Sequence, residues 1–426
     1  MIIVDTALQR RAADGNPIRV AMTGAGYMGR GIALQIEKYL PGMRLVAISN
    51  RTISEAERAY QEAGIQGAKK VETARELEDA LQAGLYAVTQ DPAVLCEADG
   101  IEAIIEATGD VDYSAPIALK AIENKKHLIL MNAELDATVG PILKVYADRA
   151  GVVISNADGD QPGVMMNLYR FATSIGYKPV VAGNIKGLQD HYRTPETQKG
   201  FAKQHNLSPE MATSFADGTK ISMENAIVAN ATGFRVARRG MYGPECSHVK
   251  DAVNLFPQSE MLEHGFVDYI LGAEPGPGVF IIGYNDHPIR KSYMQYFKMG
   301  DGPFYVFYIP YHLPHLEVPL TAARAVLFED AAVTPLGGPV CDVVTIAKRD
   351  LKEGEVLDGI GGFTCYGTID NYNISVRDNL LPMGLSEGCR LKKNISKDTA
   401  IRNSDVDIDK DRMSVRLRQE QDAYFK

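Results

Sequence analysis

The sequence predicts an α/β protein in which a doubly wound parallel sheet is followed by a central α+β domain and a small β-rich C-terminal domain. Three observations support this prediction. Short apolar runs alternate with helical segments through residues 1–155, which is typical of parallel strands joined by crossover helices. A glycine-rich turn follows the first apolar run. Beyond it, the polar and turn-rich segment NADGDQPG (156–163) marks the end of the first domain.

The elements expected in the first domain follow the apolar runs. Strands are predicted at residues 18–22, 44–49, 86–88, 103–107, 127–131 and 152–154. Helices are predicted at residues 31–39, 54–63, 115–124 and 139–150. A Thr/Ser cap introduces the second of these helices.

The remaining chain is expected to form two further domains. Residues 156–340 combine predicted helices at 164–174 and 223–239 with aromatic strand-like runs at 279–284 and 304–309, which indicates an α+β domain. A helix at 320–328 is expected to pack back onto the first domain. The helical signal fades in residues 341–426, where AKRDLKEGEVL (347–357) and LKKNISKDTAIRNSDV (391–406) are weakly alike. We therefore predict a compact β-rich module there.

Composition limits the partners of the chain. Its 426 residues carry a net charge of -9, which disfavours nucleic acid and anionic membranes because both select clustered Lys and Arg. The five cysteines form no CxxC pair and no zinc-type spacing, so reduced structural thiols are expected. The N-terminal residues lack the apolar core of a signal peptide, and no apolar run approaches membrane-spanning length. We expect a soluble, cytoplasmic protein.

The strongest local signal is VAMTGAGYMGRG, residues 20–31. Gly24, Gly26 and Gly29 fit GxGxxG between a strand and a helix, the dinucleotide-binding pattern of a Rossmann domain. The first glycine permits the tight turn, the second lets the pyrophosphate approach the backbone, and the third allows close helix–strand packing. The intervening residues Ala25, Tyr27 and Met28 would present amides to the phosphates. The competing interpretation is a glycine-rich turn without a ligand.

The ends of later strands supply further cofactor candidates. Asn50 and Arg51 follow the second strand, where an NAD site would place a carboxylate, so a guanidinium at this point favours NADP(H). Arg51 is alternatively a solvated surface residue. Other strand ends bring small or polar groups to the edge where ligands of parallel sheets bind, although plain strand-to-helix turns would look the same. These candidates are Ala107, Thr108, Gly109 and Asn132.

These motifs resemble known families. GAGYMGRG, EATG and NAE are similar to the nucleotide domain of homoserine dehydrogenase. The central stretches NADGDQPG, GNIKGLQDHYRTPETQKGFA, MATSFADGTKISMENA and ANATGFRVARRGMYGP instead resemble the 1-deoxy-D-xylulose 5-phosphate reductoisomerase-like proteins. Those proteins join a homoserine-dehydrogenase-like core to a C-terminal SAF-like segment, which AKRDLKEGEVL resembles.

The resemblance implies an NADPH-dependent reductoisomerase. Such an enzyme would convert 1-deoxy-D-xylulose 5-phosphate to 2-C-methyl-D-erythritol 4-phosphate for isoprenoid precursor synthesis, with Mg or Mn as a further expected cofactor. A homodimer is expected by the same analogy. Two alternatives remain open at this stage: a homoserine-dehydrogenase-type enzyme that acts on another small hydroxy acid, amino acid or sugar phosphate, and a non-catalytic nucleotide-binding protein.

Candidates for the chemistry lie in the central domain. Lys186 and Lys220 each lie close to glycines, and a desolvated lysine could act as an acid near neutral pH, although each could equally be a surface charge. Asp190 is a third catalytic candidate. An anionic substrate would need cationic donors. The candidates for that role are His191, Arg193, Arg235, Arg238 and Arg239.

Two of these predictions carry explicit alternatives. Arg235, Arg238 and Arg239 are expected near the C-terminal end of one helix, where they could hold a phosphate or simply complement the helix dipole. Asp158, Asp160 and Glu224 are oxygen ligands of the kind that Mg or Mn prefers, but no spacing requires a metal, and a turn is the favoured interpretation for the two aspartates.

Overall fold

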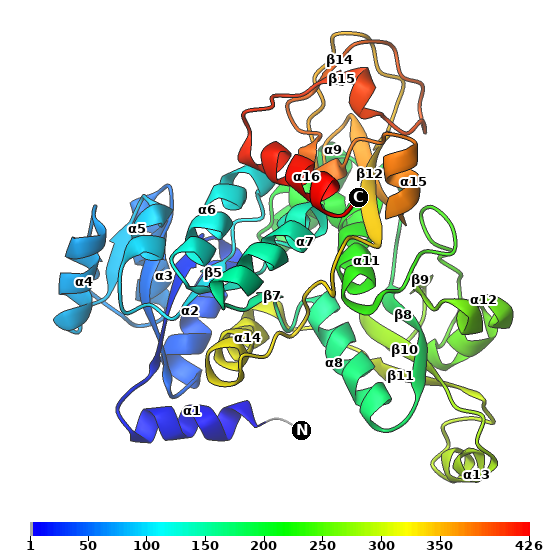
Figure 1. Cartoon of the computed structure of the whole chain (residues 1–426), viewed down its shortest axis with the longest axis horizontal. Coiled ribbons are helices and arrows are strands. Elements are labelled where there is room, and N and C mark those ends of the chain that lie inside the picture. The colour runs from blue at the N-terminus through cyan, green and yellow to red at the C-terminus, as the bar shows by residue number, and fades with distance from the viewer. Residues whose placement is uncertain (1–2) are drawn as a thin grey trace.

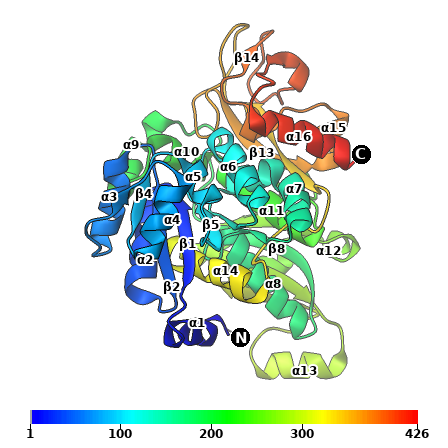
Figure 2. The ribbon, with the colours of Figure 1, turned by 60° about the vertical axis from the view of Figure 1, so that its left-hand side comes forward.

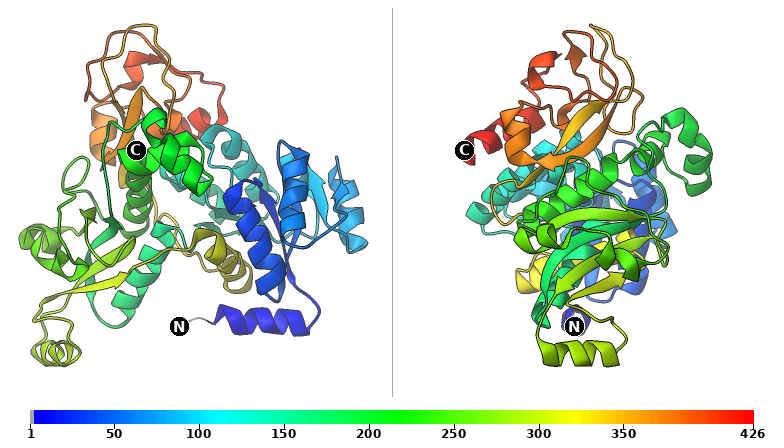
Figure 3. Two further views of the ribbon diagram at one scale, coloured as in Figure 1. Left: turned by 180° about the vertical axis from the view of Figure 1, so that it is seen from behind. Right: turned by 90° about the vertical axis from the view of Figure 1, so that its right-hand side faces the viewer.

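A computed structural model describes residues 3–426 of the chain. Three parts surround a shared centre (Figure 1). A parallel sheet with its helices forms the first part, a four-stranded sheet forms the second, and a small module built from the C-terminal residues lies against both (Figure 3).

The first part contains a seven-stranded parallel sheet whose strand order is β3-β4-β2-β1-β5-β6-β7. The order reverses at β1, with one half of the sheet on each side, as in a doubly wound dinucleotide-binding fold. This topology confirms the predicted fold class. The strands are β1 (Ile18–Thr23), β2 (Met43–Ser49), β3 (Lys69–Lys70), β4 (Ala87–Thr89), β5 (Ala103–Glu106), β6 (His127–Leu130) and β7 (Ile154–Asn156).

Helices cover both faces of this sheet (Figure 2). They are α1 (Val4–Ala13), α2 (Tyr27–Tyr39), α3 (Ile53–Glu62), α4 (Ala74–Gln82), α5 (Pro92–Glu97), α6 (Val111–Glu123) and α7 (Ala133–Ala150). A late helix, α14 (Pro314–Phe328), also packs here, because its buried Val318, Ala322 and Ala325 belong to the same apolar core as β1 and α2. The chain thus returns to its first sheet after building the second.

The second part is a mixed sheet with strand order β11-β10-β8-β9. β8 (Lys178–Lys186) pairs parallel with β9 (Phe266–Leu271) and antiparallel with β10 (Gly278–Tyr284), which in turn pairs with β11 (Phe304–Ile309). The helices and turns of this part are α8 (Gln161–Ser174), α9 (Pro195–His205), α10 (Pro209–Asp217), α11 (Thr219–Thr232), η1 (Val249–Asn254), α12 (Gln258–Glu263) and α13 (Pro288–Tyr296). Two of them, α8 and α11, pack on the sheet and place their N-terminal ends near the end of β8.

The C-terminal module is rich in short strands and bridges. Its elements are β12 (Cys341–Ala347), β13 (Cys365–Asn371), α15 (Tyr372–Arg377), η2 (Met383–Leu385), β14 (Arg390–Leu391), η3 (Asn403–Asp405), β15 (Val406–Asp407) and α16 (Met413–Tyr424). The two similar sequence stretches pair with one another through bridges such as Leu351 to Ile395. Helix α16 was not expected, since its buried side chains include Ser414, Arg418 and Gln421 and leave no apolar stripe.

Glycines let this module lie directly on the other two parts. A Cβ at Gly384 would meet Thr138 Oγ1 of α7 at 2.0 Å, and one at Gly361 would meet the carbonyl oxygen of Glu210 in α10 at 2.0 Å. These contacts hold the module against the helices that carry the candidate site. Among residues 3–426, no helix combines the length and the apolar character needed to cross a bilayer.

Candidate active site

The glycine-rich turn has the geometry that the sequence predicts for a dinucleotide loop. Gly24 has φ +96°, which favours glycine, and a Cβ there would meet the carbonyl oxygen of Ala107 at 2.7 Å. A Cβ at Gly29 would meet the carbonyl oxygen of Gly24 at 2.5 Å, so this residue keeps α2 close to the turn. A Cβ at Gly26 would meet nothing within 4 Å. Space for a phosphate therefore opens at Gly26, the N-cap of α2, and Ala25, Tyr27 and Met28 flank it.

The end of β2 closes one side of this loop. Asn50 accepts a hydrogen bond from the Ala25 amide at 3.1 Å, and its side-chain amide donates to the Thr52 carbonyl at 2.9 Å. Asn50 therefore orders the loop. Arg51 is exposed, lies 5.8 Å from the centre of the Tyr113 ring, and forms no ion pair among the contacts of residues 3–426. Its guanidinium is free to meet an anion.

A hydrogen-bonded network connects the ends of β5 and β6. Buried Glu106 accepts from the Thr108 amide at 2.9 Å and from its hydroxyl at 2.5 Å. Ser114 lies 2.8 Å from that hydroxyl and accepts from the Asn132 side chain at 3.1 Å. Burial raises the pKa of Glu106. The network fixes the strand-end groups Ala107, Thr108, Gly109 and Asn132 along one edge of the sheet.

A cleft of about 290 Å³ runs along this edge. Arg51, Thr108, Gly109 and Glu134 line it from the sheet side. The C-terminal module supplies part of the opposite wall, through Ile360, Met383, Gly384, Glu387 and Arg412. Of the predicted cofactor residues, Arg51, Thr108 and Gly109 thus face this cleft.

Beyond Glu134 lies a buried polar cluster at the starts of three helices. Glu134 is in the first turn of α7, Asp160 caps α8, and Lys220 is in the first turn of α11. The Lys220 ammonium lies 3.3 Å from Glu134 Oε1, and these side chains are 11% and 4% exposed. Carboxylates are favoured at helix N-termini and cations are not, so Lys220 depends on its acidic neighbours.

Strand β8 supplies the other wall of the cluster. The Asn184 side-chain amide donates to Gln161 and, at 3.2 Å, to Glu224 Oε2. Asn225 donates to Asn184 Oδ1 at 2.7 Å. Lys186, at the end of β8, and Glu224, one turn after Lys220 in α11, complete the group. The structure therefore brings together Lys186, Lys220, Asp160 and Glu224, four residues named from the sequence.

The charges of this cluster control its protonation. Burial and repulsion by Asp160 raise the pKa of Glu224 to about 8, against the opposing effect of Lys186 and Lys220. Burial alone would lower the pKa of Lys220, but Glu134, Asp160 and Glu224 outweigh it and raise that pKa. The expectation of a desolvated lysine acting as an acid near neutral pH is therefore wrong for Lys220. It is a permanent cation, and Glu224 is the group that holds a proton at neutral pH.

Sequence reasoning missed several members of the site. Glu134, Gln161, Asn184 and Asn225 lie within the stretches that carry the family resemblances, but no role was assigned to them. Only the tertiary fold brings these buried polar residues together. His312 was noticed but not assigned. Burial lowers its pKa, and Asp160, Lys186 and Lys220 are its charged neighbours, so it faces the same cluster.

The three central-domain arginines are not where the sequence predicted them. Helix α11 ends at Thr232, because Gly233 adopts φ +78° and Arg235 then bridges to Phe266 of the second sheet. Arg238 donates to the Met241 and Tyr242 carbonyls, and Arg239 pairs with Asp370 at 2.6 Å. The segment begins at the end of α11 opposite Lys220, a helix length of roughly 20 Å at 1.5 Å per residue. The prediction that these arginines share one helix is therefore wrong, and their role in substrate binding stays a prediction.

The other predicted ligands form separate groups. Asp158 pairs with Arg324 at 2.9 Å and accepts from Asn167, so it does not join Asp160 and Glu224. In the described part of the chain, no three His, Cys, Asp or Glu side chains are arranged to hold a metal ion. The divalent cation stays a prediction. Asp190 and Arg193 pair at 3.0 Å, whereas His191 stacks on Tyr366 of the C-terminal module.

A family model and a curated protein each match part of the chain. The family model described as "Oxidoreductase DRL, catalytic domain" matches residues 159–318, which include Asp160, Lys186, Lys220 and Glu224. Homoserine dehydrogenase from Neisseria gonorrhoeae is 24% identical over 132 residues, which cover 31% of this chain and 30% of that protein. The alignment thus spans less than a third of this curated relative.

Solved structures align with this chain at low identity and low TM-score. A probable dehydrogenase from Thermotoga maritima gives a TM-score of 0.43 at 13% identity and covers 75% of this chain and 91% of its own. A myo-inositol dehydrogenase from Corynebacterium glutamicum gives 0.38 at 13% identity, covering 63% and 73%. Residues 159–318 thus match an oxidoreductase catalytic domain, and they follow a doubly wound sheet in the same chain.

Proposed function

We propose that the protein is an NADPH-dependent oxidoreductase that reduces a carbonyl group, or oxidises the corresponding hydroxyl group, of a small polar substrate. One observation carries the proposal. Glu134 lines the cofactor cleft together with Arg51, Thr108 and Gly109, and it also pairs with Lys220 of the buried cluster. A cofactor site and a proton-transfer site therefore adjoin.

The chain's own residues fit the cofactor. The open space at Gly26 and the N-terminus of α2 suit a pyrophosphate, and the free guanidinium of Arg51 suits the 2′-phosphate of NADP(H). The edge formed by Thr108, Gly109 and Asn132 would hold the nicotinamide end. When bound, the nicotinamide supplies or accepts the hydride.

The buried cluster would handle the substrate oxygen and its proton. Lys220 is a permanent cation and would stabilise negative charge that develops on the oxygen during reduction. Glu224, whose pKa is raised to about 8, is protonated at neutral pH and would donate the proton that converts this oxygen to a hydroxyl. Asn184 and Gln161 would orient neighbouring hydroxyl groups.

Two substrate classes are the finer candidates. The match of residues 159–318 to the DRL catalytic domain favours 1-deoxy-D-xylulose 5-phosphate, with rearrangement preceding reduction and a SAF-like role for the C-terminal module. The position of Arg235, Arg238 and Arg239 outside the cluster favours a dehydrogenase of a substrate without phosphate, of the homoserine dehydrogenase type. A homodimer in the cytoplasm remains part of both proposals.

An optical assay decides between these candidates. Purified protein is given NADPH and 1-deoxy-D-xylulose 5-phosphate, with and without Mg²⁺ or Mn²⁺, and separately NADP⁺ and homoserine. Absorbance of the reduced cofactor is followed in both. Turnover of either substrate, lost in Lys220→Met, supports the proposal and selects the class. If Lys220→Met keeps the wild-type rate, the assignment of the chemistry to this cluster is wrong.

A further inference from the structure

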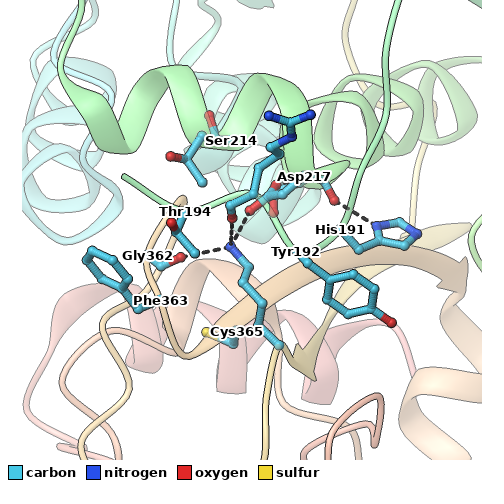
Figure 4. Close-up of polar contacts among 12 residues, drawn as sticks. His191, Tyr192, Thr194, Ser214, Asp217, Gly362, Phe363 and Cys365 are labelled. Atoms are coloured by element: carbon cyan, nitrogen blue, oxygen red, sulfur yellow. Dashed lines mark hydrogen bonds and ion pairs between the residues drawn. The ribbon is translucent and has the colours of Figure 1, made fainter. Parts of the chain in front are cut away.

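A lysine of the C-terminal module is buried beneath the start of α11. Lys348 follows β12, and its side chain is 3% exposed. Its ammonium donates to the Arg193 carbonyl at 2.8 Å, to Asp217 Oδ2 at 2.9 Å and to the Gly362 carbonyl at 2.8 Å (Figure 4). A lysine ammonium has three donors, so every one of them is used.

Asp217 links Lys348 to α11, the helix that carries Lys220. Its side chain is fully buried, and its second oxygen accepts the Thr219 amide at 2.9 Å in the first turn of α11. Its backbone carbonyl accepts from His191 Nδ1 at 2.7 Å, which Figure 4 also shows. Lys220 is the next residue after Thr219. One carboxylate thus joins the C-terminal module to the helical turn that carries Lys220.

A second contact from the module reaches the same turn. The Gly367 amide of β13 donates to the Thr219 hydroxyl at 2.8 Å. Between the two contacts lies Gly218, which joins α10 to α11 with φ +95°, a conformation that costs glycine little and gives the junction no rigidity of its own. The direction in which α11 starts therefore depends on partners outside α11. Asp217 of α10 and Glu134 of α7 contact this turn, and the C-terminal module acts on it through Lys348 and Gly367.

A buried ion pair is a costly way to gain stability alone, because desolvation offsets most of the attraction, but it defines one geometry. We propose that Lys348 is a positioning residue for Lys220, so that the C-terminal module is part of the catalytic unit. This inference rests on the proposed function, in which Lys220 acts on the substrate oxygen. A displacement of about 1 Å in a catalytic group can reduce turnover by roughly a hundredfold.

The test uses a double variant that avoids an unpaired buried charge. Lys348→Met with Asp217→Asn removes both charges, while the asparagine oxygen can still accept the Thr219 amide. Lys348→Arg is the conservative rescue. Arg418→Met with Asp342→Asn is the matched control, because Arg418 forms a similarly buried pair with Asp342 at 2.6 Å and joins α16 to β12 rather than to α11.

Two readouts are compared in the full-length protein. Hydrogen exchange of peptide 217–225 reports the order of the helix start without any substrate. Turnover of the substrate that the optical assay selects, at saturating NADPH, reports the chemistry. A fluorescence titration gives the Kd for NADPH. The double variant should exchange faster in this peptide and turn over roughly tenfold more slowly or worse, with Kd within about threefold of wild type. Lys348→Arg should recover part of the rate, and Arg418→Met with Asp342→Asn should keep wild-type exchange in this peptide.

Unchanged exchange, or wild-type turnover in a folded double variant, overturns the inference. The failure of the proposed function looks different. If the wild-type protein turns over neither substrate, or if Lys220→Met is fully active, that function fails by itself. If the wild-type protein turns over neither substrate, the hydrogen-exchange comparison alone decides whether Lys348 holds the start of α11.

Discussion

Gly26, the N-cap of α2, and Gly29, in the first turn of α2, lie three residues apart, and the structure predicts opposite consequences for replacing them by alanine. A Cβ at Gly26 meets nothing within 4 Å, and the residue has φ -67°, which alanine adopts without strain. Gly26→Ala should therefore keep wild-type stability. The added methyl group would, however, occupy the space that a pyrophosphate needs. Losing one charge-assisted hydrogen bond costs about 1.5–3 kcal/mol, so we expect the Kd for NADPH to rise roughly 10- to 100-fold.

Gly29→Ala should act on the fold instead. Its Cβ would lie 2.5 Å from the carbonyl oxygen of Gly24, so α2 or the loop must move by roughly 1 Å. Overpacking of this kind costs about 1–3 kcal/mol, which lowers Tm by several degrees. Thermal melting and a fluorescence titration with NADPH separate the two effects. Wild-type NADPH affinity in Gly26→Ala would refute the placement of the cofactor on this loop.

Three further predictions address charge. Arg51→Asp should weaken NADPH far more than NADH in parallel titrations, because the guanidinium would pair with the 2′-phosphate; equal losses would mean that Arg51 does not contact it. Reductive turnover should fall as pH rises through about 8, because Glu224 loses its proton there; its charged neighbours are Asp160, Glu134, Lys186 and Lys220. Glu224→Gln should show no such fall in rate around pH 8. If the fall persists in the variant, Glu224 is not the proton donor. Burial raises the pKa of Asp136 to about 7, so its ionisation opposes folding increasingly as pH rises from 4 to 7. Between pH 5 and 8, urea unfolding of wild type should lose on the order of 3 kcal/mol relative to Asp136→Asn, and parallel curves would contradict this.

The cofactor half of the site could be predicted from the sequence because its signals are local. Gly24, Gly26 and Gly29 are required by the backbone of one turn, and the apolar runs around them have the spacing of strands and helices. The same pattern predicted alternating strands and helices in a doubly wound parallel sheet, which the structure contains.

The catalytic half depends on long-range contacts that no local pattern reveals. Glu134 and Lys220 are 86 residues apart in the sequence, and each looks like an ordinary helix charge until the helix starts meet. The three arginines Arg235, Arg238 and Arg239 were placed wrongly because a local pattern was present but misleading. Their spacing suits a helix face, but Gly233 ends α11 before them and bridging to Phe266 makes the segment extended. No local pattern assigned a role to Lys348, because its partners come from three different parts of the chain.

Calorimetric titration with NADPH is the most direct test of the central claim that the loop from Gly24 to Gly29 binds a phosphorylated pyridine dinucleotide. The structure predicts one NADPH per chain, bound more tightly than NADH, with binding weakened in Gly26→Ala. Absence of binding by both reduced coenzymes to the folded wild-type protein would contradict the account.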